Sequence, residues 1–505
     1  MSEAAAIAIP PSRRVLLLVP LLLSTTLGMI NQTNVVVALP HMQGTFSATR
    51  EQIAWVLTSY LVTVTILTAS TGWIGARFGR KQVYMAALVG FGVTSALCAN
   101  APTLETEVLF RLLQGVAAGP IFPVTQSILL DVYPKDRHGE ALGLWGVSIT
   151  IGPVLGPILG GVITEEYGWP WIFYFNVPLA ALCLFLVVLW VPETPKAPGR
   201  RFDVTGFFAM AVMITAFQLA LNRGQTLDWF DSTEIVVATA LAAFALYVLA
   251  VHTATAKHSF LDPKLFTDRS FALGLLFIVV WAMMVNGPIV LLSLRLQSVD
   301  GLPVDAVGYL MAPRGLGGVA SMSVVGYMVR RFNPKLIAAF GFSLIAVAGW
   351  MMQSWPPQAD RADVALSGFI LGFGISQAYV SLTVMAMATI APSQRPDAVS
   401  LYSLVANIGM GTGVAVAVFM LSQFMPSHHE SMAANVSVFN ELFRGHLLPH
   451  SWNFGSAKGL MAVNEQVNLQ AATQAFNDTF RLITIVAAAA LPFVFFLARP
   501  TRTAR

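Results

Sequence analysis

The feature that most constrains this chain is a series of fourteen apolar stretches, each long enough to cross a lipid bilayer. A membrane-spanning helix needs roughly 20 mostly apolar residues, and within the bilayer every backbone polar group needs a partner from the protein itself. Soluble proteins carry about 25% charged residues, whereas this chain of 505 residues carries 11%. We therefore predict an all-α polytopic membrane protein. The expected helices cover residues 15–39, 51–74, 83–99, 104–130, 140–163, 171–191, 204–221, 234–251, 271–297, 305–329, 336–353, 365–390, 398–424 and 479–497.

Lysine and arginine are distributed unevenly between the two sets of loops. Loops on one side contain clusters such as Arg13–Arg14, Arg80–Lys81 and Arg330–Arg331, whereas loops on the other side contain isolated residues such as Arg223 and Arg444. Cytoplasmic loops carry the excess of basic residues. The bias predicts that both termini are cytoplasmic, in the cytoplasmic (inner) membrane of a bacterium.

An internal repeat divides the chain. GWIGARFGRK (72–81) is echoed by GYMVRRFNPK (326–335), and YPKDR at Tyr133 is echoed by APSQR at Ala391. The paired loops face the same side, as in parallel repeats of transporters. Eight helices separate them, so the helices 204–221 and 234–251 are interpreted as an insertion between two six-helix bundles.

This interpretation gives the following organisation. A cytoplasmic N-terminus covers 1–14, the first bundle 15–191, a linker with two inserted helices 192–270, the second bundle 271–497 and a cytoplasmic tail 498–505. The long outer loop, 426–478, belongs to the second bundle. We expect it to be partly helical, because GLMAVNEQVNLQAATQAF (459–476) has helix-forming character.

One expected helix is rich in glycine and proline, with the sequence GVSITIGPVLGPILGG (146–161). Proline removes a backbone donor, and glycine lets another helix approach closely. Such defects are tolerated in a bilayer only where neighbouring protein or a cavity satisfies the backbone. We predict a bent helix that packs at the interface between the bundles. Its motif residues are Gly146, Gly152, Pro153, Gly156, Pro157, Gly160 and Gly161.

Charged residues inside the bilayer are costly and are functional candidates. Arg111 lies roughly 12 Å from the outer face if its helix begins near Thr103. Glu107 lies one turn earlier, and Asn31 lies at a depth that allows all three to share a layer. In the alternative interpretation, Glu107 is a wetted residue at a helix start and Arg111 anchors backbone carbonyls.

Two further arginines lie within apolar stretches. Arg295 is close to the outer end of its helix, where we expect its side chain to snorkel into the interface. Arg314 lies roughly 13 Å inside the bilayer and is a candidate for the transport cavity. Amides at mid-membrane depth either line the pathway or form interhelical hydrogen bonds, and aromatic side chains are candidates for stacking on flat ligands. The amides are Asn34, Gln114, Gln126, Gln218, Asn286, Gln377 and Asn407, and the aromatic residues are Tyr60, Trp145 and Tyr379.

Several function classes lack their signatures. The sequence contains no phosphate-binding loop of the GxxxxGK[ST] type, which argues against an ATP-driven pump. No histidines pair at metal-ligand spacing within a helix, and His428–His429 is interpreted as a surface pair. We find no catalytic constellation, and expect neither a metal, a cofactor nor a nucleic-acid partner.

These motifs resemble the major facilitator superfamily, and within it the 14-helix drug:proton antiporters, especially EmrB-type multidrug exporters. The run GPVLGPILGG resembles the antiporter motif, GWIGARFGRK the motif of the loop between helices 2 and 3, and LFRLLQGVAAGP the helix 4 motif. TNVVVALP resembles the helix 1 signature, while WPWIFYFNVP and NRGQTLDWF are typical of the subgroup. The resemblance covers nearly the whole chain.

The resemblance implies specific roles. Arg111 would take part in proton coupling, and Gly72, Arg77, Gly79 and Arg80 would form a gate on the cytoplasmic side. EmrB-type proteins work with a periplasmic adaptor and an outer-membrane channel, which are the expected protein partners.

The chain also departs from the family pattern at two positions. Ala76 stands where the loop motif commonly has aspartate, and Asn31 stands where the helix 1 signature normally has a carboxylate. Because asparagine cannot titrate, our hypothesis is that Glu107, held by Arg111, replaces that carboxylate.

The expected function is export of amphipathic or lipophilic small molecules by alternating access, driven by proton antiport, with membrane lipid surrounding the protein. The alternative within transport is a lipid, lysolipid or fatty-acid exporter with weaker or different ion coupling. A membrane sensor or scaffold is the alternative outside transport, and the antiporter motif and the repeat argue against it.

Overall fold

The computed structural model describes residues 11–134, 137–193, 196, 202–224, 226–256, 262–391, 394–436 and 456–496. Over these residues the chain is helical and contains no strand. Residues 1–10 of the expected N-terminus and all of the expected tail 498–505 lie outside this description. The helices of the first half are α1 (Pro11–Phe46), α2 (Arg50–Ile53), α3 (Trp55–Phe78), α4 (Arg80–Ala99), α5 (Leu104–Ala118), α6 (Ile121–Val132), α7 (His138–Tyr167), α8 (Trp171–Tyr174) and α9 (Asn176–Trp190).

The inserted pair and the second half follow in order. The inserted segment contains α10 (Val204–Gly224), the short 3-10 helix η2 (Trp229–Asp231), α11 (Thr233–Thr255) and α12 (Pro263–Thr267). The second half contains α13 (Arg269–Ser298), α14 (Val304–Arg331), α15 (Pro334–Met352), α16 (Arg361–Met387), α17 (Arg395–Ala433) and α19 (Ala457–Val494).

Each of the fourteen expected stretches coincides with a helix or a pair of consecutive helices. Within the described residues, 13 spans are long and apolar enough to cross a membrane. The one expected stretch that is not among these spans is 305–329, which corresponds to α14, a helix of 28 residues. It is less apolar because it contains Arg314 and several glycines. One expected helix, 104–130, is divided into α5 and α6 at Gly119–Pro120, where proline lacks a backbone donor.

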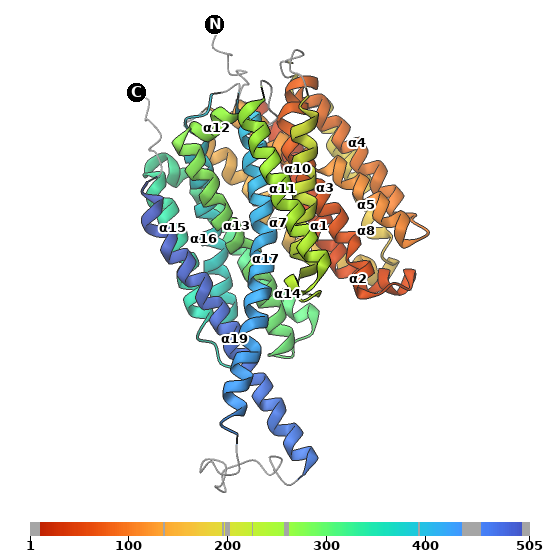
Figure 1. Cartoon of the computed structure of the whole chain (residues 1–505). Coiled ribbons are helices and arrows are strands. Elements are labelled where there is room, and N and C mark those ends of the chain that lie inside the picture. The colour runs from red at the N-terminus through yellow and green to blue at the C-terminus, as the bar shows by residue number, and fades with distance from the viewer. Residues whose placement is uncertain are drawn as a thin grey trace.

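The helices form two bundles, which confirms the predicted fold class. In Figure 1, α3, α4, α5 and α8 lie on one side and α13, α15, α16 and α19 on the other, with α7, α14 and α17 between them. α10 and α11 pack against each other, and α10 also packs against α3 and α17. The inserted pair therefore covers one side of the junction between the bundles, whereas α7 and α14 meet within that junction.

We call the end of the molecule at which α1 begins and α19 ends the terminal face, and the opposite end the hairpin face (Figure 1). α17 and α19 project together beyond the hairpin face. The expected helix limits at 424 and 479 are therefore wrong, because α17 continues to Ala433 and α19 begins at Ala457. Hydropathy detects only the apolar part of a helix, and these extensions are polar. The predicted helical character of 459–476 is confirmed, and His428 Nε2 lies 2.7 Å from the Asp478 carboxylate at the base of the hairpin.

Glycines of α7 allow close packing on two different helices. A Cβ atom at Gly160 would lie 2.9 Å from the Cα of Asn34 on α1, and Gly152 and Gly156 meet the same helix. A Cβ atom at Gly143, nearer the terminal face, would lie 2.7 Å from the carbonyl oxygen of Met322 on α14. α7 thus packs inside its own bundle near the hairpin face and against the other bundle near the terminal face.

Substituting Gly160 by alanine is expected to lower the stability of the protein. The new Cβ would meet the backbone of Asn34 at 2.9 Å, which forces α1 and α7 apart, and overpacking of this kind costs about 1–3 kcal/mol. The melting temperature of the purified protein in detergent measures the effect. Gly161 is the matched control, because its Cβ would meet only Val37, at 3.9 Å. G161A should be neutral or slightly stabilising, and an equal loss in both variants would contradict the packing argument.

Candidate functional site

Arg111 is the centre of a polar network inside the first bundle. Its side chain is fully buried, and Nε donates a hydrogen bond to the Val56 carbonyl of α3 at 3.1 Å. The guanidinium also donates to Gln114, whose amide donates to Ser95 at 2.7 Å. It lies 4.1 Å from the centroid of the Tyr60 ring, a cation–π contact. Arg111 therefore contacts α3 and its own helix directly, and it is connected to α4 through Gln114.

Glu107 is fully buried one turn before Arg111. Neither of its carboxyl oxygens has a hydrogen-bond partner within the described residues, and the Cys98 side chain lies beside it. The interpretation of Glu107 as a wetted residue at a helix start is therefore wrong. The other part of that alternative, in which Arg111 bonds backbone carbonyls, agrees with the Val56 contact.

Asn31 and Asn34 of α1 are also buried in the first bundle. The Asn31 carbonyl accepts a hydrogen bond from the amide of Asn176 on α9 at 2.8 Å, and Asn34 packs against Gly160. Tyr60 lies between Asn31 and Arg111. The three residues predicted to share a layer are thus brought into one bundle interior, with Tyr60 as the contact that the sequence analysis did not identify.

Near the terminal face, charged residues connect the two bundles. Asp131 of α6 pairs with Arg80 of α4, and it lies 3.7 Å from Arg395 of α17, in the other bundle. Gly72 of α3 packs so closely on Asp397 that a Cβ would lie 2.8 Å from its Cα.

Four other residues near the terminal face belong to the loop motif or to the junction. Gly79 joins α3 to α4 with a φ angle of 92°, which favours glycine, and Arg77 lies in the last turn of α3. Across the junction, Arg330 of α14 lies 3.7 Å from Glu140 of α7. The repeated loops therefore lie where the bundles are held together.

An aromatic cluster spans the junction deeper in the molecule. The rings of Trp145 (α7) and Tyr379 (α16) stack across it with centroids 6.3 Å apart, and Trp281 (α13) lies 4.7 Å from Tyr379. Gln126 of α6 donates a hydrogen bond to the Tyr379 hydroxyl at 3.2 Å. The sequence pattern indicated Trp145, Tyr379 and Gln126 but not Trp281, because an apolar helix offers no signal for which tryptophan faces inward.

The remaining amides occupy different environments. Gln114 belongs to the Arg111 network, and Gln218 of α10 donates to Thr65 of α3 at 3.3 Å, which is an interhelical bond of the inserted pair. Gln377 is fully buried, and neither of its amide atoms has a partner within the described residues. Asn286 and Asn407 are half-buried.

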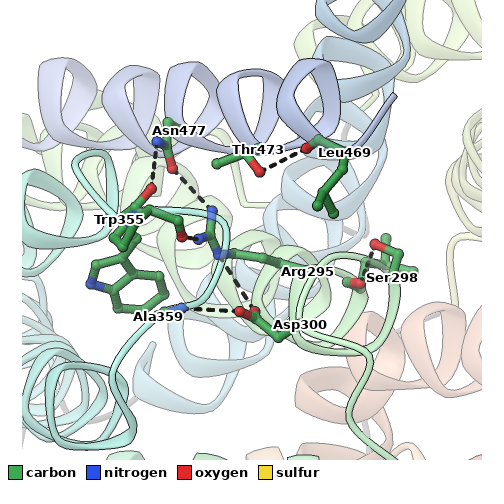
Figure 2. Close-up of polar contacts among 10 residues, drawn as sticks. Arg295, Ser298, Asp300, Trp355, Ala359, Leu469, Thr473 and Asn477 are labelled. Atoms are coloured by element: carbon green, nitrogen blue, oxygen red, sulfur yellow. Dashed lines mark hydrogen bonds and ion pairs between the residues drawn. The ribbon is translucent and has the colours of Figure 1, made fainter. Parts of the chain in front are cut away.

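Arg295 does not snorkel, in contrast to the expectation from its position near a helix end. It is fully buried, and Figure 2 shows it surrounded by polar groups. The guanidinium donates to the Pro356 carbonyl at 2.6 Å and to Asn477 of α19 at 3.1 Å, and it lies 3.9 Å from Asp300. Because Pro356 and Asn477 are far from Arg295 in sequence, only the fold reveals the site. Arg295 ties α13, the α15–α16 connection and α19 together at the hairpin face.

Removing the Arg295 charge should destabilise the second bundle. R295Q would leave Asp300 buried without its cationic partner, and breaking a buried pair costs about 3–5 kcal/mol. The melting temperature in detergent measures the loss. R223Q is the control, because Arg223 and Glu234 form a pair with exposed side chains (35% and 40%), and such pairs contribute about 0–1 kcal/mol. Equal melting temperatures for R295Q and R223Q would contradict the structural role.

Neutralising Asp131 should loosen the terminal face, because D131N removes the contacts with both Arg80 and Arg395. A cysteine introduced at Ser400, which is 1% exposed near the start of α17, would then react faster with a maleimide. The experiment uses a background in which Cys98 and Cys183 are replaced by alanine. R330Q should have the smaller effect, since its pair with Glu140 is exposed. Unchanged labelling in D131N would disprove a closing role for Asp131.

Comparison with known proteins identifies relatives over most of the chain. Residues 21–414 match the Major Facilitator Superfamily profile. The chain is 32% identical over 429 residues to the multidrug export protein EmrB of Escherichia coli K12, covering 84% of each chain. It is 29% identical over 482 residues to the fatty acid resistance protein FarB of Neisseria gonorrhoeae, covering 95% of this chain and 94% of FarB.

A solved structure supports the same fold. The proton:xylose symporter XylE superposes with a TM-score of 0.60, covering 97% of this chain and 96% of XylE, at 14% sequence identity.

Proposed function

The chain belongs to the Major Facilitator Superfamily, among the EmrB-type multidrug exporters, and from this premise we propose that it expels amphipathic, lipophilic compounds by proton-driven alternating access. Family membership makes it a multi-pass membrane transporter rather than an enzyme. The substrate class follows the export function in the names of its relatives.

The two-sided packing of α7 is the observation that carries this proposal. Near the hairpin face α7 packs tightly on α1 of its own bundle, and near the terminal face it packs on α14 of the other bundle. The second contact can separate while the first remains, because only the second joins different bundles. Opening the α7–α14 contact, together with the Asp131–Arg395 contact, would expose the aromatic cluster to the terminal face.

Orientation and localisation follow from the basic loops. The terminal face would be cytoplasmic, because it carries the arginine and lysine clusters, in a bacterial inner membrane. The α17–α19 hairpin would then be periplasmic. There it would be the contact for an adaptor that leads to an outer-membrane channel, which are partners that the family resemblance implies.

Glu107 is the proposed proton carrier. Asn31 cannot titrate, whereas Glu107 is a fully buried carboxyl group that has no hydrogen-bond partner among the described residues and lies one turn from Arg111. Gain or loss of one proton changes the charge beside Arg111. Through Tyr60 and Val56, the Arg111 network contacts α3, whose other end packs on α17 of the second bundle. Protonation could thereby bias the arrangement of the bundles.

E107Q should abolish proton-driven efflux and leave substrate binding intact, since glutamine keeps the size of the side chain but cannot exchange a proton. The measurement is efflux from proteoliposomes with an imposed pH gradient, with binding followed by intrinsic fluorescence. E105Q is the matched control, because Glu105 is exposed on the same turn of α5. Efflux in E107Q at the rate of E105Q would exclude Glu107 as the carrier.

Fatty-acid export is the second candidate function, favoured by the 29% identity to FarB over nearly the whole chain. A fatty-acid or lysolipid exporter with weaker ion coupling would transport a long-chain carboxylate at similar rates with and without a pH gradient. A drug:proton antiporter would require the gradient. Transport of both compound types in the same proteoliposomes separates the two functions.

A further inference from the structure

We propose that Arg314 is the recognition site for the anionic head group of an amphipathic carboxylate, with the substrate's apolar part directed toward the Trp281–Tyr379 aromatic pair. This inference rests on the proposed export function and specifies the charge of the substrate. It assigns to Arg314 a binding role that its depth in the membrane alone does not define.

The position of Arg314 on α14 supports this assignment. Gly318 and Met322 follow it by one and two helical turns, and both pack against α7, at Thr150 and at Gly143 and Gly146 respectively. Residues at such spacing lie on the same side of a helix. By this spacing Arg314 lies in line with Gly318 and Met322, one turn nearer the hairpin face than the part of α14 that packs on α7. Its own printed contacts are within the second bundle: a Cβ at Gly368 of α16 would lie 3.7 Å from the Arg314 Cβ, and its guanidinium reaches α13.

The bonding of the guanidinium is incomplete. Arg314 Nη2 donates one hydrogen bond, to the Val285 carbonyl of α13 at 2.7 Å, and its buried Nε has no partner in the residues that the structure describes. In the described part of the chain no carboxylate lies within 4 Å of it. A guanidinium has five N–H donors, and a charge at membrane depth is costly unless it is paired. A carboxylate fits this group best, because it accepts two parallel hydrogen bonds from arginine.

The neighbouring helices hold the group in place and provide an apolar surface. The backbone of Arg314 packs directly on Gly372 of α16, where a Cβ has no room. On α13, Trp281 lies one turn before Val285, the residue whose carbonyl binds Arg314. Trp281 Nε1 donates to the Ile375 carbonyl at 2.8 Å, and its ring contacts Tyr379. A cationic group and an aromatic surface thus lie about one turn, roughly 5 Å, apart along the helix.

The internal repeat shows that the two bundles differ at this point. Tyr60 and Arg314 each lie 12 residues before the repeated glycine, Gly72 or Gly326. In the first bundle the aromatic ring of Tyr60 covers Arg111, which also bonds Val56 and Gln114. In the second bundle the corresponding position is itself the cation, and it has a single carbonyl partner. Arg111 thus has several protein contacts and one unpartnered nitrogen, Nη2, whereas Arg314 has one hydrogen bond and an unpartnered Nε within the described residues.

Two amphiphiles with the same chain length and opposite charge test the proposal. Binding of radiolabelled dodecanoate and of dodecyltrimethylammonium is measured on the full-length protein in nanodiscs, and their transport in proteoliposomes. R314Q should weaken dodecanoate binding about tenfold or more, since hydrogen bonds to charged groups are among the stronger ones. Binding of dodecyltrimethylammonium should be unchanged or stronger. R331Q is the matched control, because Arg331 lies on the same helix but is exposed and bonds Tyr327.

The outcomes separate this inference from the proposed function. If R314Q weakens both amphiphiles equally, or leaves dodecanoate binding unchanged, Arg314 is not the anion site. If the unaltered protein transports the cation but not dodecanoate, the inference fails and the export function stands. If it transports neither these amphiphiles nor any lipophilic drug, the export function fails. Should R314Q not fold, R314K serves instead, because lysine keeps the charge but loses the bidentate geometry. A selective, several-fold loss of dodecanoate binding is then expected. Dodecanoate binding equal to that of the unaltered protein would overturn the proposal.

Discussion

Helix α7 packs through glycines on two different helices, at positions where a side chain would not fit. The arrangement of the other helices depends on this close packing of α7. Its glycines bring its backbone against α1 in the same bundle and, closer to the terminal face, against α14 in the other bundle. In a bilayer, helix association depends on close packing and on hydrogen bonds, because the lipid is as apolar as the side chains. The first contact builds a bundle, and the second joins two bundles.

Polar groups inside this packed structure form two kinds of environment. Arg111 and Arg295 are held by carbonyls, amides and aromatic rings from several helices, so they connect elements that are distant in sequence. Arg314, by contrast, makes a single hydrogen bond within the described residues, to the Val285 carbonyl. Burial of a charge thus has different consequences at different sites, and the number of partners distinguishes a structural arginine from a candidate binding residue.

The sequence predicted features that depend on local composition, and it failed where contacts between distant segments decide the outcome. Apolar length and the repeated loops predicted the helices, the two bundles and the inserted pair, since a bilayer imposes helix length directly. The expectation for Arg295 was wrong, because nearness to a helix end does not reveal whether Asp300, Asn477 and the Pro356 carbonyl surround the side chain. The ends of α17 and α19 were misplaced because their extensions are polar, and polar helices leave no hydropathy signal.

The sequence by itself determined that this chain crosses the membrane as helices, and it predicted parallel halves and a position at membrane depth for Arg111, Glu107 and Arg314. These follow from composition and spacing, which act locally along each helix. Only the tertiary structure decided that Tyr60 separates Asn31 from Arg111, that Trp281 joins the aromatic cluster, and that Arg395 reaches Asp131 across the bundles. Those contacts depend on the rotation and depth of one helix against another. Close packing at glycines sets both, and no single segment of the sequence encodes them.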